Sequence, residues 1–152
     1  MPERHKRKLL GDVTLVDLPE MRDAREGALA FVEFDRHVPF AVPRIFYLYE
    51  LPQGARRGEH AHRTLEQLLI CIAGSIEVTT ENRLGRHRFI LETRRQGLYV
   101  PPMTWLALSA REAGTICLVL ASEHFDEADY IRSYAYFEKI LRGSPGHAHD
   151  HG

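Results

Sequence analysis

Two histidines and a glutamate stand close together in the stretch 57–67, which reads RGEHAHRTLEQ. In an extended chain, residues i and i+2 point to the same face, so the side chains of His60 and His62 converge. If this alternation continues through Thr64, Glu66 lies on that face as well. Two imidazoles and a carboxylate at one point suit either the binding of a metal ion or the transfer of a proton.

The composition is that of a globular protein without a strong overall charge. The chain has 152 residues, of which 44% are hydrophobic and 27% charged, and its net charge is -1. This length favours one domain with a real core, and no overall field draws the chain to nucleic acid or to a membrane. No apolar run approaches the roughly 20 residues of a membrane span, and the basic N-terminus lacks the apolar region of a signal peptide. We therefore expect a cytoplasmic protein with neither of these partners.

Short runs of β-branched and aromatic residues, separated by turn signals, predict that most of the chain is β-structure. Many short strands at this spacing indicate a sandwich or a barrel. The Ala73–Gly74 step is either a turn between two strands or a kink in one long strand. Apolar residues near a 3.6-residue period predict one helix over 126–141. The expected strands are Val13–Leu18, Ala28–Phe34, Arg44–Leu51, Glu66–Ala73, Ser75–Thr80, His87–Glu92, Leu98–Val100, Trp105–Leu108 and Thr115–Ala121.

Both ends of the chain are expected to be flexible tails around one domain. Residues 1–10 hold a basic cluster, and residues 143–152 are small and polar with several histidines, where we place no metal site. The domain then covers residues 11–142. Cys71 and Cys117 lie in apolar runs, so we expect buried, reduced thiols.

The spacing Gly-(x)5-His-x-His-(x)3-Glu, from Gly54 through His60 and His62 to Glu66, resembles the first motif of the cupins. This resemblance implies an all-β cupin jelly-roll barrel with a short C-terminal helix. A second cupin motif normally ends in a histidine that completes a metal site, but this chain has Leu106 there. A metal-dependent cupin with a facial triad of the two histidines and the glutamate stays open as an alternative.

Three blocks together resemble the dTDP-4-keto-6-deoxyglucose 3,4-ketoisomerase family of cupins. They are the stretch 57–67, the stretch 97–105 (GLYVPPMTW) and the stretch 120–134 (LASEHFDEADYIRSY). The resemblance implies an isomerase of deoxysugar biosynthesis, which moves the keto group of a dTDP-4-keto-6-deoxyhexose from C4 to C3 through an enediol, without a metal or other cofactor. It also implies a homodimer, in which a strand at 13–18 is a candidate to extend the partner's sheet.

The same resemblance implies roles for individual side chains. His60 is expected to carry the proton and His62 to orient the substrate or share the transfer, because an imidazole pKa of ~6.5 lies near working pH. Tyr47 is expected to donate a hydrogen bond to the developing oxyanion. Arg57 is the candidate for binding the diphosphate, since a guanidinium matches phosphate oxygens in pairs, and Arg44 is the second candidate.

Three further residues are candidate substrate contacts with simpler alternatives. Glu66 either contacts the substrate or satisfies a buried histidine or arginine. Trp105 either stacks on a base or sugar or packs in the core, which is commoner for a tryptophan in a barrel, and Tyr99 is undecided. Because Leu106 replaces the histidine that relatives carry, a non-catalytic cupin that binds sugar nucleotides is a further alternative.

Overall fold

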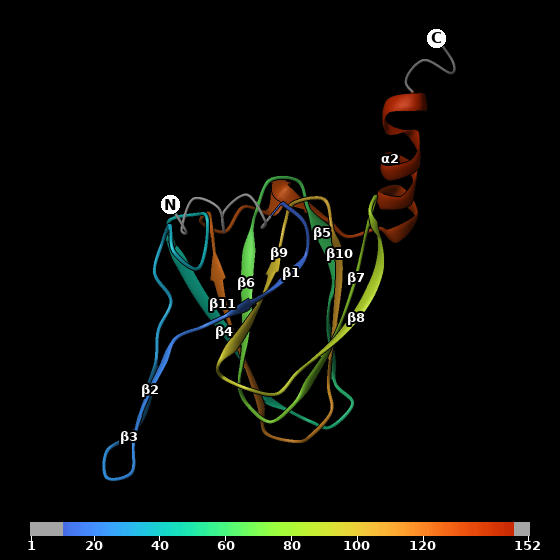
Figure 1. Ribbon diagram of the computed structural model, residues 1–152. Coiled ribbons are helices and arrows are strands. Elements are labelled where there is room, and N and C mark those ends of the chain that lie inside the picture. The colour runs from blue at the N-terminus through green and yellow to red at the C-terminus, as the bar shows by residue number, and fades with distance from the viewer. Residues whose placement is uncertain (1–10, 148–152) are drawn as a thin grey trace.

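The computed structural model describes residues 11–147, and two five-stranded antiparallel sheets facing each other form its body (Figure 1). Sheet A has the order β1 (Thr14–Asp17), β9 (Gln96–Val100), β6 (Gln67–Ala73), β11 (Thr115–Ala121) and β4 (Arg44–Leu51). Sheet B has the order β12 (Tyr130–Ile131), β5 (Arg56–His62), β10 (Trp105–Ala110), β7 (Ile76–Asn82) and β8 (Gly85–Leu91). The predicted all-β barrel is confirmed, and the step at Gly74 is a turn that carries the chain from one sheet to the other.

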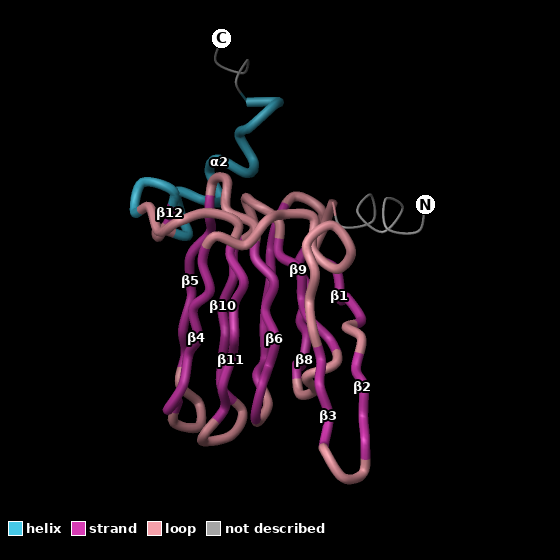
Figure 2. The backbone as a smooth tube through the Cα atoms, turned by 90° about the vertical axis from the view of Figure 1, so that its left-hand side faces the viewer, coloured by secondary structure: helices cyan, strands magenta, loops and turns pink. Residues whose placement is uncertain are grey.

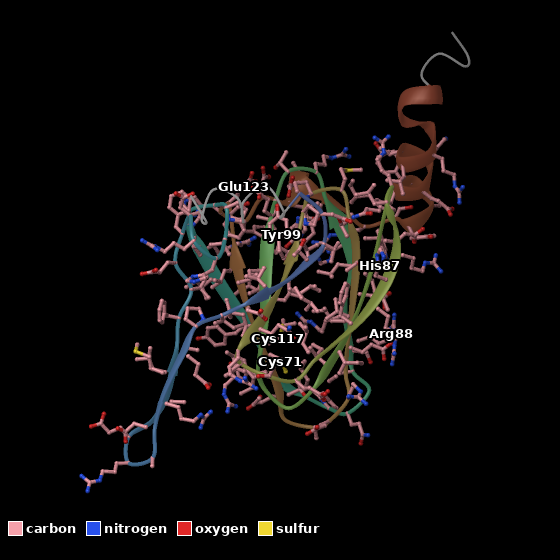
Figure 3. The ribbon with its side chains drawn as sticks, viewed as in Figure 1. Cys71, His87, Arg88, Tyr99, Cys117 and Glu123 are labelled. Carbon is pink, nitrogen blue, oxygen red and sulfur yellow. The ribbon has the colours of Figure 1, made fainter. Side chains whose placement is uncertain are left out.

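The core lies between the two sheets and is filled by the inward-facing side chains of both. In β7 the buried positions alternate with partly exposed ones, as expected for a strand with one face on the core. Cys71 on β6 and Cys117 on β11 are direct cross-strand partners in this core, and both are free and buried, as predicted (Figure 3). Burial raises the pKa of the Cys71 thiol to about 11 and that of Cys117 to about 12, so both are unreactive at neutral pH.

The N-terminal segment covers part of the outer face of sheet A. β1 pairs with β9, so the strand expected at 13–18 extends the sheet of its own chain. Beyond β3 (Gly27–Ala30) the chain is a loop rather than the expected strand to Phe34, and it returns across the sheet. A second apolar cluster joins this segment to the sheet; it consists of Val16, Leu18, Val38, Phe40, Leu68, Ile70, Tyr99 and Leu120.

A two-stranded hairpin projects away from the barrel, at the end opposite the C-terminal helix (Figures 1 and 2). It consists of β2 (Glu20–Asp23) and β3 (Gly27–Ala30), and nearly all of its residues are exposed. Met21 and Leu29 are direct cross-strand partners, and their side chains are 61% and 55% exposed. The hairpin therefore has an apolar pair that its own chain leaves uncovered.

The helix expected over 126–141 is three separate elements. Asp126 caps a short 3-10 turn, η1 (Glu127–Asp129), by accepting a hydrogen bond from the backbone of Ala128, and the chain then extends into β12. The α-helix α2 (Tyr134–His147) follows, so residues 143–147, which we expected in the C-terminal tail, are helical. The predictions for residues 1–10 and 148–152 lie outside the described residues. Within residues 11–147, α2 is too short and too polar to cross a bilayer, and no other helix comes closer.

Candidate active site

A cavity of about 490 Å³ opens between the two sheets. It brings together four of the side chains that the sequence indicated, namely His60, His62, Arg57 and Arg44. Strand β5, absent from our expected strands, carries three of them. The wall from sheet B and the segment after it consists of Arg56, Arg57, Gly58, His60, His62, Leu106, Leu108, Tyr130 and Arg132. The wall from sheet A consists of Arg44, Phe46, Leu48, Gln67, Leu69 and Val119.

A β-bulge in β5 lets Arg57 and the two histidines line one cavity. Leu106 of β10 lies opposite His60, but the register then shifts, so that β5 has one residue more than β10. Gly58 and Glu59 at this shift have φ values of 82° and 63°, and a Cβ on Gly58 would lie 3.0 Å from the carbonyl oxygen of Leu106. The bulge therefore requires this glycine, and strict alternation along the strand does not predict its effect on Arg57.

His62 is held by a carboxylate from the η1 turn. Its Nδ1 atom lies 3.0 Å from Oδ2 of Asp129, and both side chains are buried. Burial alone would raise the pKa of Asp129, but hydrogen bonds from the backbone and hydroxyl of Thr64 and from His62 outweigh burial and lower it. An ionised carboxylate can only accept, so Nδ1 of His62 carries the hydrogen and Nε2 is the basic nitrogen.

The two imidazoles lie against each other, with their ring centroids 4.9 Å apart and their planes nearly perpendicular. Burial lowers the pKa of His62 to about 4, and the neighbouring His60 contributes further. The pKa of His60 is also lowered, chiefly by burial and in part by the positive charge of Arg132. His60 is the more exposed of the two, so it is the imidazole more accessible to a bound molecule, and it is neutral at pH 7.

Tyr130 and Arg132, which the sequence analysis did not single out, complete this side of the cavity. The Tyr130 ring packs on both imidazoles, with centroid distances of 4.9 Å to His60 and 4.3 Å to His62. The Arg132 guanidinium lies 4.1 Å from the centroid of the Tyr130 ring and forms two hydrogen bonds with Glu127. Both residues belong to the stretch 120–134, but its near-helical periodicity concealed the pairing of β12 with β5.

Among residues 11–147, four arginines line the cavity and no carboxylate does. Arg56 and Arg132 are paired with glutamates. Arg44 and Arg57, by contrast, have no carboxylate partner within residues 11–147, and the Nε atom of Arg44 is buried without a hydrogen-bond partner. Two such guanidiniums, in a cavity whose described lining has no acidic group, can bind an anion, and their planar donors suit phosphate oxygens.

Tyr47, expected to donate a hydrogen bond in the site, lies outside the cavity and is 59% exposed. Alternation along β4 explains this, because Phe46 and Leu48 point inward and Tyr47 therefore points outward. Trp105 lies outside as well. It packs against Tyr134 and Phe137 of α2, with ring centroids 5.3 Å and 5.6 Å away, which is the packing alternative.

Glu66 does not join the two histidines, because β5 ends at His62 and the chain turns before β6 begins. Its carboxylate accepts a hydrogen bond of 2.7 Å from the Tyr99 hydroxyl, away from the cavity. Glu66 and Tyr99 therefore satisfy each other, and neither contacts the cavity. In the described part of the chain, no group of three His, Cys, Asp or Glu side chains is arranged to hold a metal ion, so the facial triad is not formed.

Comparisons with known proteins agree over most of the chain. The family model described as "FdtA: WxcM-like, C-terminal" matches residues 11–142. TDP-4-oxo-6-deoxy-alpha-D-glucose-3,4-oxoisomerase of Aneurinibacillus thermoaerophilus is 33% identical over 127 residues, which cover 84% of this chain and 91% of that protein.

Solved structures show the same similarity. The sugar 3,4-ketoisomerase QdtA from Thermoanaerobacterium thermosaccharolyticum, in complex with TDP, superposes with a TM-score of 0.82 at 32% identity, over 88% of this chain and 96% of that one. The TDP-quinovose 3,4-ketoisomerase WlaRB from Campylobacter jejuni has a TM-score of 0.79 at 33% identity, over 87% of this chain and 98% of that one.

Proposed function

Because the chain belongs to the family described as FdtA, WxcM-like, C-terminal, we propose that it is a 3,4-ketoisomerase acting on a TDP-linked 4-keto-6-deoxyhexose in deoxysugar biosynthesis. One observation carries the proposal for this chain. His60 lies beside a His62–Asp129 pair inside a cavity lined by four arginines. Neutral imidazoles suit the transfer of a proton between carbons, and the guanidiniums suit the diphosphate of the substrate. The cytoplasmic location expected from the sequence stays a prediction.

The reaction needs a base at C3 and an acid at C4, which are neighbouring carbons, and one imidazole can serve both. His60 removes the proton from C3, the C3–H electron pair forms the C3=C4 double bond, and the carbonyl electrons move to O4. The hydroxyl proton of O3 passes to O4, and His60 then returns its proton to C4 while C3–O3 becomes the carbonyl. Atoms and charge balance, since two hydrogens move and nothing is gained or lost.

The neighbouring groups support these steps. His62 presents a basic Nε2 because Asp129 fixes the hydrogen on Nδ1, so it suits the relay of the hydroxyl proton from O3 to O4. Tyr130 is the tyrosine that lines the cavity, and it takes the place we expected for Tyr47 as a donor to the charge that develops on O4. Arg57 and Arg44 bind the diphosphate.

Proton exchange tests this proposal. The purified protein should convert TDP-4-keto-6-deoxyglucose to the 3-keto isomer and exchange the C3 proton with D2O, as followed by NMR. His60→Asn should abolish both. His87→Asn is the matched control, because His87 is exposed on β8, away from the cavity (Figure 3). Absence of isomer and of exchange would refute the activity, and tight binding of TDP-sugar without exchange would indicate the non-catalytic alternative.

We also propose that the protein is a homodimer, from two uncovered apolar surfaces of one chain. A two-stranded ribbon such as β2–β3 is marginal in water without support, and its Met21–Leu29 pair is exposed. The outer face of β4 presents Ile45, Tyr47 and Tyr49, each more than half exposed. In a two-fold dimer, each copy covers with its hairpin the β4 face of the other.

The dimer is tested by sedimentation velocity over a range of concentrations. Tyr47→Lys should shift the equilibrium towards monomer, because it places a charge in the proposed interface. Leu84→Lys is the control, since Leu84 is 68% exposed at the turn between β7 and β8. A wild-type protein that sediments as a monomer at every concentration would rule the dimer out.

A further inference from the structure

The two walls of the cavity differ in the groups that can carry a proton. His60, His62 and Tyr130 all belong to sheet B. The wall from sheet A is mostly apolar, and its two polar side chains are Arg44 and Gln67. A guanidinium stays protonated at any working pH and an amide does not titrate, so neither acts as an acid or a base. Among the described residues, proton carriers therefore line one side of the cavity.

Leu106 limits the positions on sheet B that hold a group able to carry a proton. His60, Leu106 and Thr80 form a row across β5, β10 and β7, because Leu106 is the direct partner of both other residues. Leu106 is 3% exposed and lines the cavity, whereas Thr80 is fully buried and does not. An isobutyl group therefore occupies the inward position next to His60, and the proton carriers are confined to β5 and β12.

A keto sugar held between these walls has one face towards sheet B and the other towards sheet A. The C3 hydrogen must face His60 to be removed. The enediol is planar at C3 and C4, so C4 can receive its proton from either face. Among the described residues, no side chain of the sheet A wall can deliver a proton to C4.

We infer that both proton transfers take place on one face of the enediol, so that the product has an axial hydroxyl at C4, the galacto configuration. In the 4-keto-6-deoxyglucose ring the C3 hydrogen is axial on the lower face. Its transfer to the same face of C4 places the C4 hydrogen below the ring and the hydroxyl above it. This inference rests on the proposed ketoisomerase activity and deepens it, since it assigns the product class and identifies the apolar wall of sheet A as the determinant of that class.

The configuration of the product tests the inference with the unaltered protein. TDP-4-keto-6-deoxyglucose is converted in H2O, and proton NMR spectra are recorded from the first turnovers, with a protein-free sample to correct for spontaneous epimerisation. A small coupling between H4 and H5 is expected, because an equatorial H4 is gauche to H5. A large trans-diaxial coupling would show delivery from the opposite face and overturn the inference, while leaving the ketoisomerase activity intact.

A substrate with deuterium at C3 adds a second measurement. Return by the same imidazole should carry part of this deuterium to C4, as measured by NMR and mass spectrometry of the product. Deuterium at C4 in a product with small H4–H5 coupling supports transfer on one face. If no 3-keto sugar forms at all, the proposed activity fails first, and that result differs from a 3-keto product with the other configuration.

Discussion

Nδ1 of His62 lies 3.0 Å from Oδ2 of Asp129, although 67 positions separate the two residues in the chain. The contact forms because β12 pairs with β5, with Tyr130 opposite His62. One short strand therefore brings a carboxylate, an aromatic ring and a guanidinium, that of Arg132, to the two histidines. Without this pairing, the imidazoles would have no group to fix the hydrogen of His62 on Nδ1.

Asp129→Asn should lower kcat by about 10- to 100-fold, the usual effect of losing a partner that orients a histidine. An asparagine amide can donate to Nδ1 of His62, which places the hydrogen on Nε2 and removes the basic nitrogen from the cavity. Steady-state kinetics measures kcat, and calorimetric titration with TDP should give an unchanged Kd, since Asp129 does not line the cavity. A kcat close to that of the wild type would contradict this role.

The pH at which kcat/KM begins to decrease in acid should lie below 6.5. His60 must be neutral to accept the C3 proton, and its pKa is lowered by burial and by Arg132. Arg132→Gln removes that positive charge, so the pKa of His60 should rise and the acid limb should move to higher pH. Arg63→Gln, an exposed arginine outside the cavity, is the control. A limb that does not move with Arg132→Gln would show that another group controls it.

Folding stability should decrease as the pH falls from about 6.5 to about 4. The pKa of His62 is about 4 in the folded protein because of burial and the nearby His60, against ~6.5 unfolded. Between these values the unfolded chain binds a proton that the folded chain does not, so acid favours unfolding, by at most about 3 kcal/mol from this group.

His62→Gln should flatten that part of the profile. Urea unfolding of both proteins at a series of pH values measures it. The contribution of Asp129 is separate, because its lowered pKa gives a loss of stability only at still lower pH. Equal slopes for the two proteins between pH 6.5 and 4 would contradict the assignment to His62.

The sequence analysis predicted that the two histidines face the same way, and both line one cavity, because alternation within β5 is a local property. Tyr47 lies outside this cavity, and the sequence did not show this because β4 reads RIFYLYEL and has apolar side chains on both faces. Alternation alone does not identify the inner face. Glu66 does not share the face of the two histidines, since a turn after His62 ends the alternation. Asp129 could not be found from local patterns at all, because its role depends on a strand pairing between distant parts of the chain.

Arg57→Ala should weaken the binding of TDP by about 10- to 100-fold. The loss of hydrogen bonds to a charged group costs about 1.5–3 kcal/mol. Because Arg57 has no carboxylate partner in the described chain, its removal leaves no unpaired carboxylate that could rearrange. Calorimetric titration measures the Kd, which should also rise with added salt. Arg88→Ala is the control, because Arg88 lies on the exposed side of β8 and is paired there with Glu77 of β7 (Figure 3). Similar affinities for both variants would place the diphosphate elsewhere.

Gly58→Ala should reduce both stability and activity, and the chain offers a closely matched control. Gly58 and Gly114 both have a φ of 82°, so alanine at either position pays the same backbone strain, about 1–2 kcal/mol. Only at Gly58 would the new Cβ meet a neighbour, the carbonyl oxygen of Leu106 at 3.0 Å, whereas nothing lies within 4 Å at Gly114. Gly58→Ala should therefore unfold at lower urea than Gly114→Ala. It should also lower kcat, because the bulge it disturbs positions His60. If the two variants lose equal stability and keep equal kcat, the bulge does not position the site.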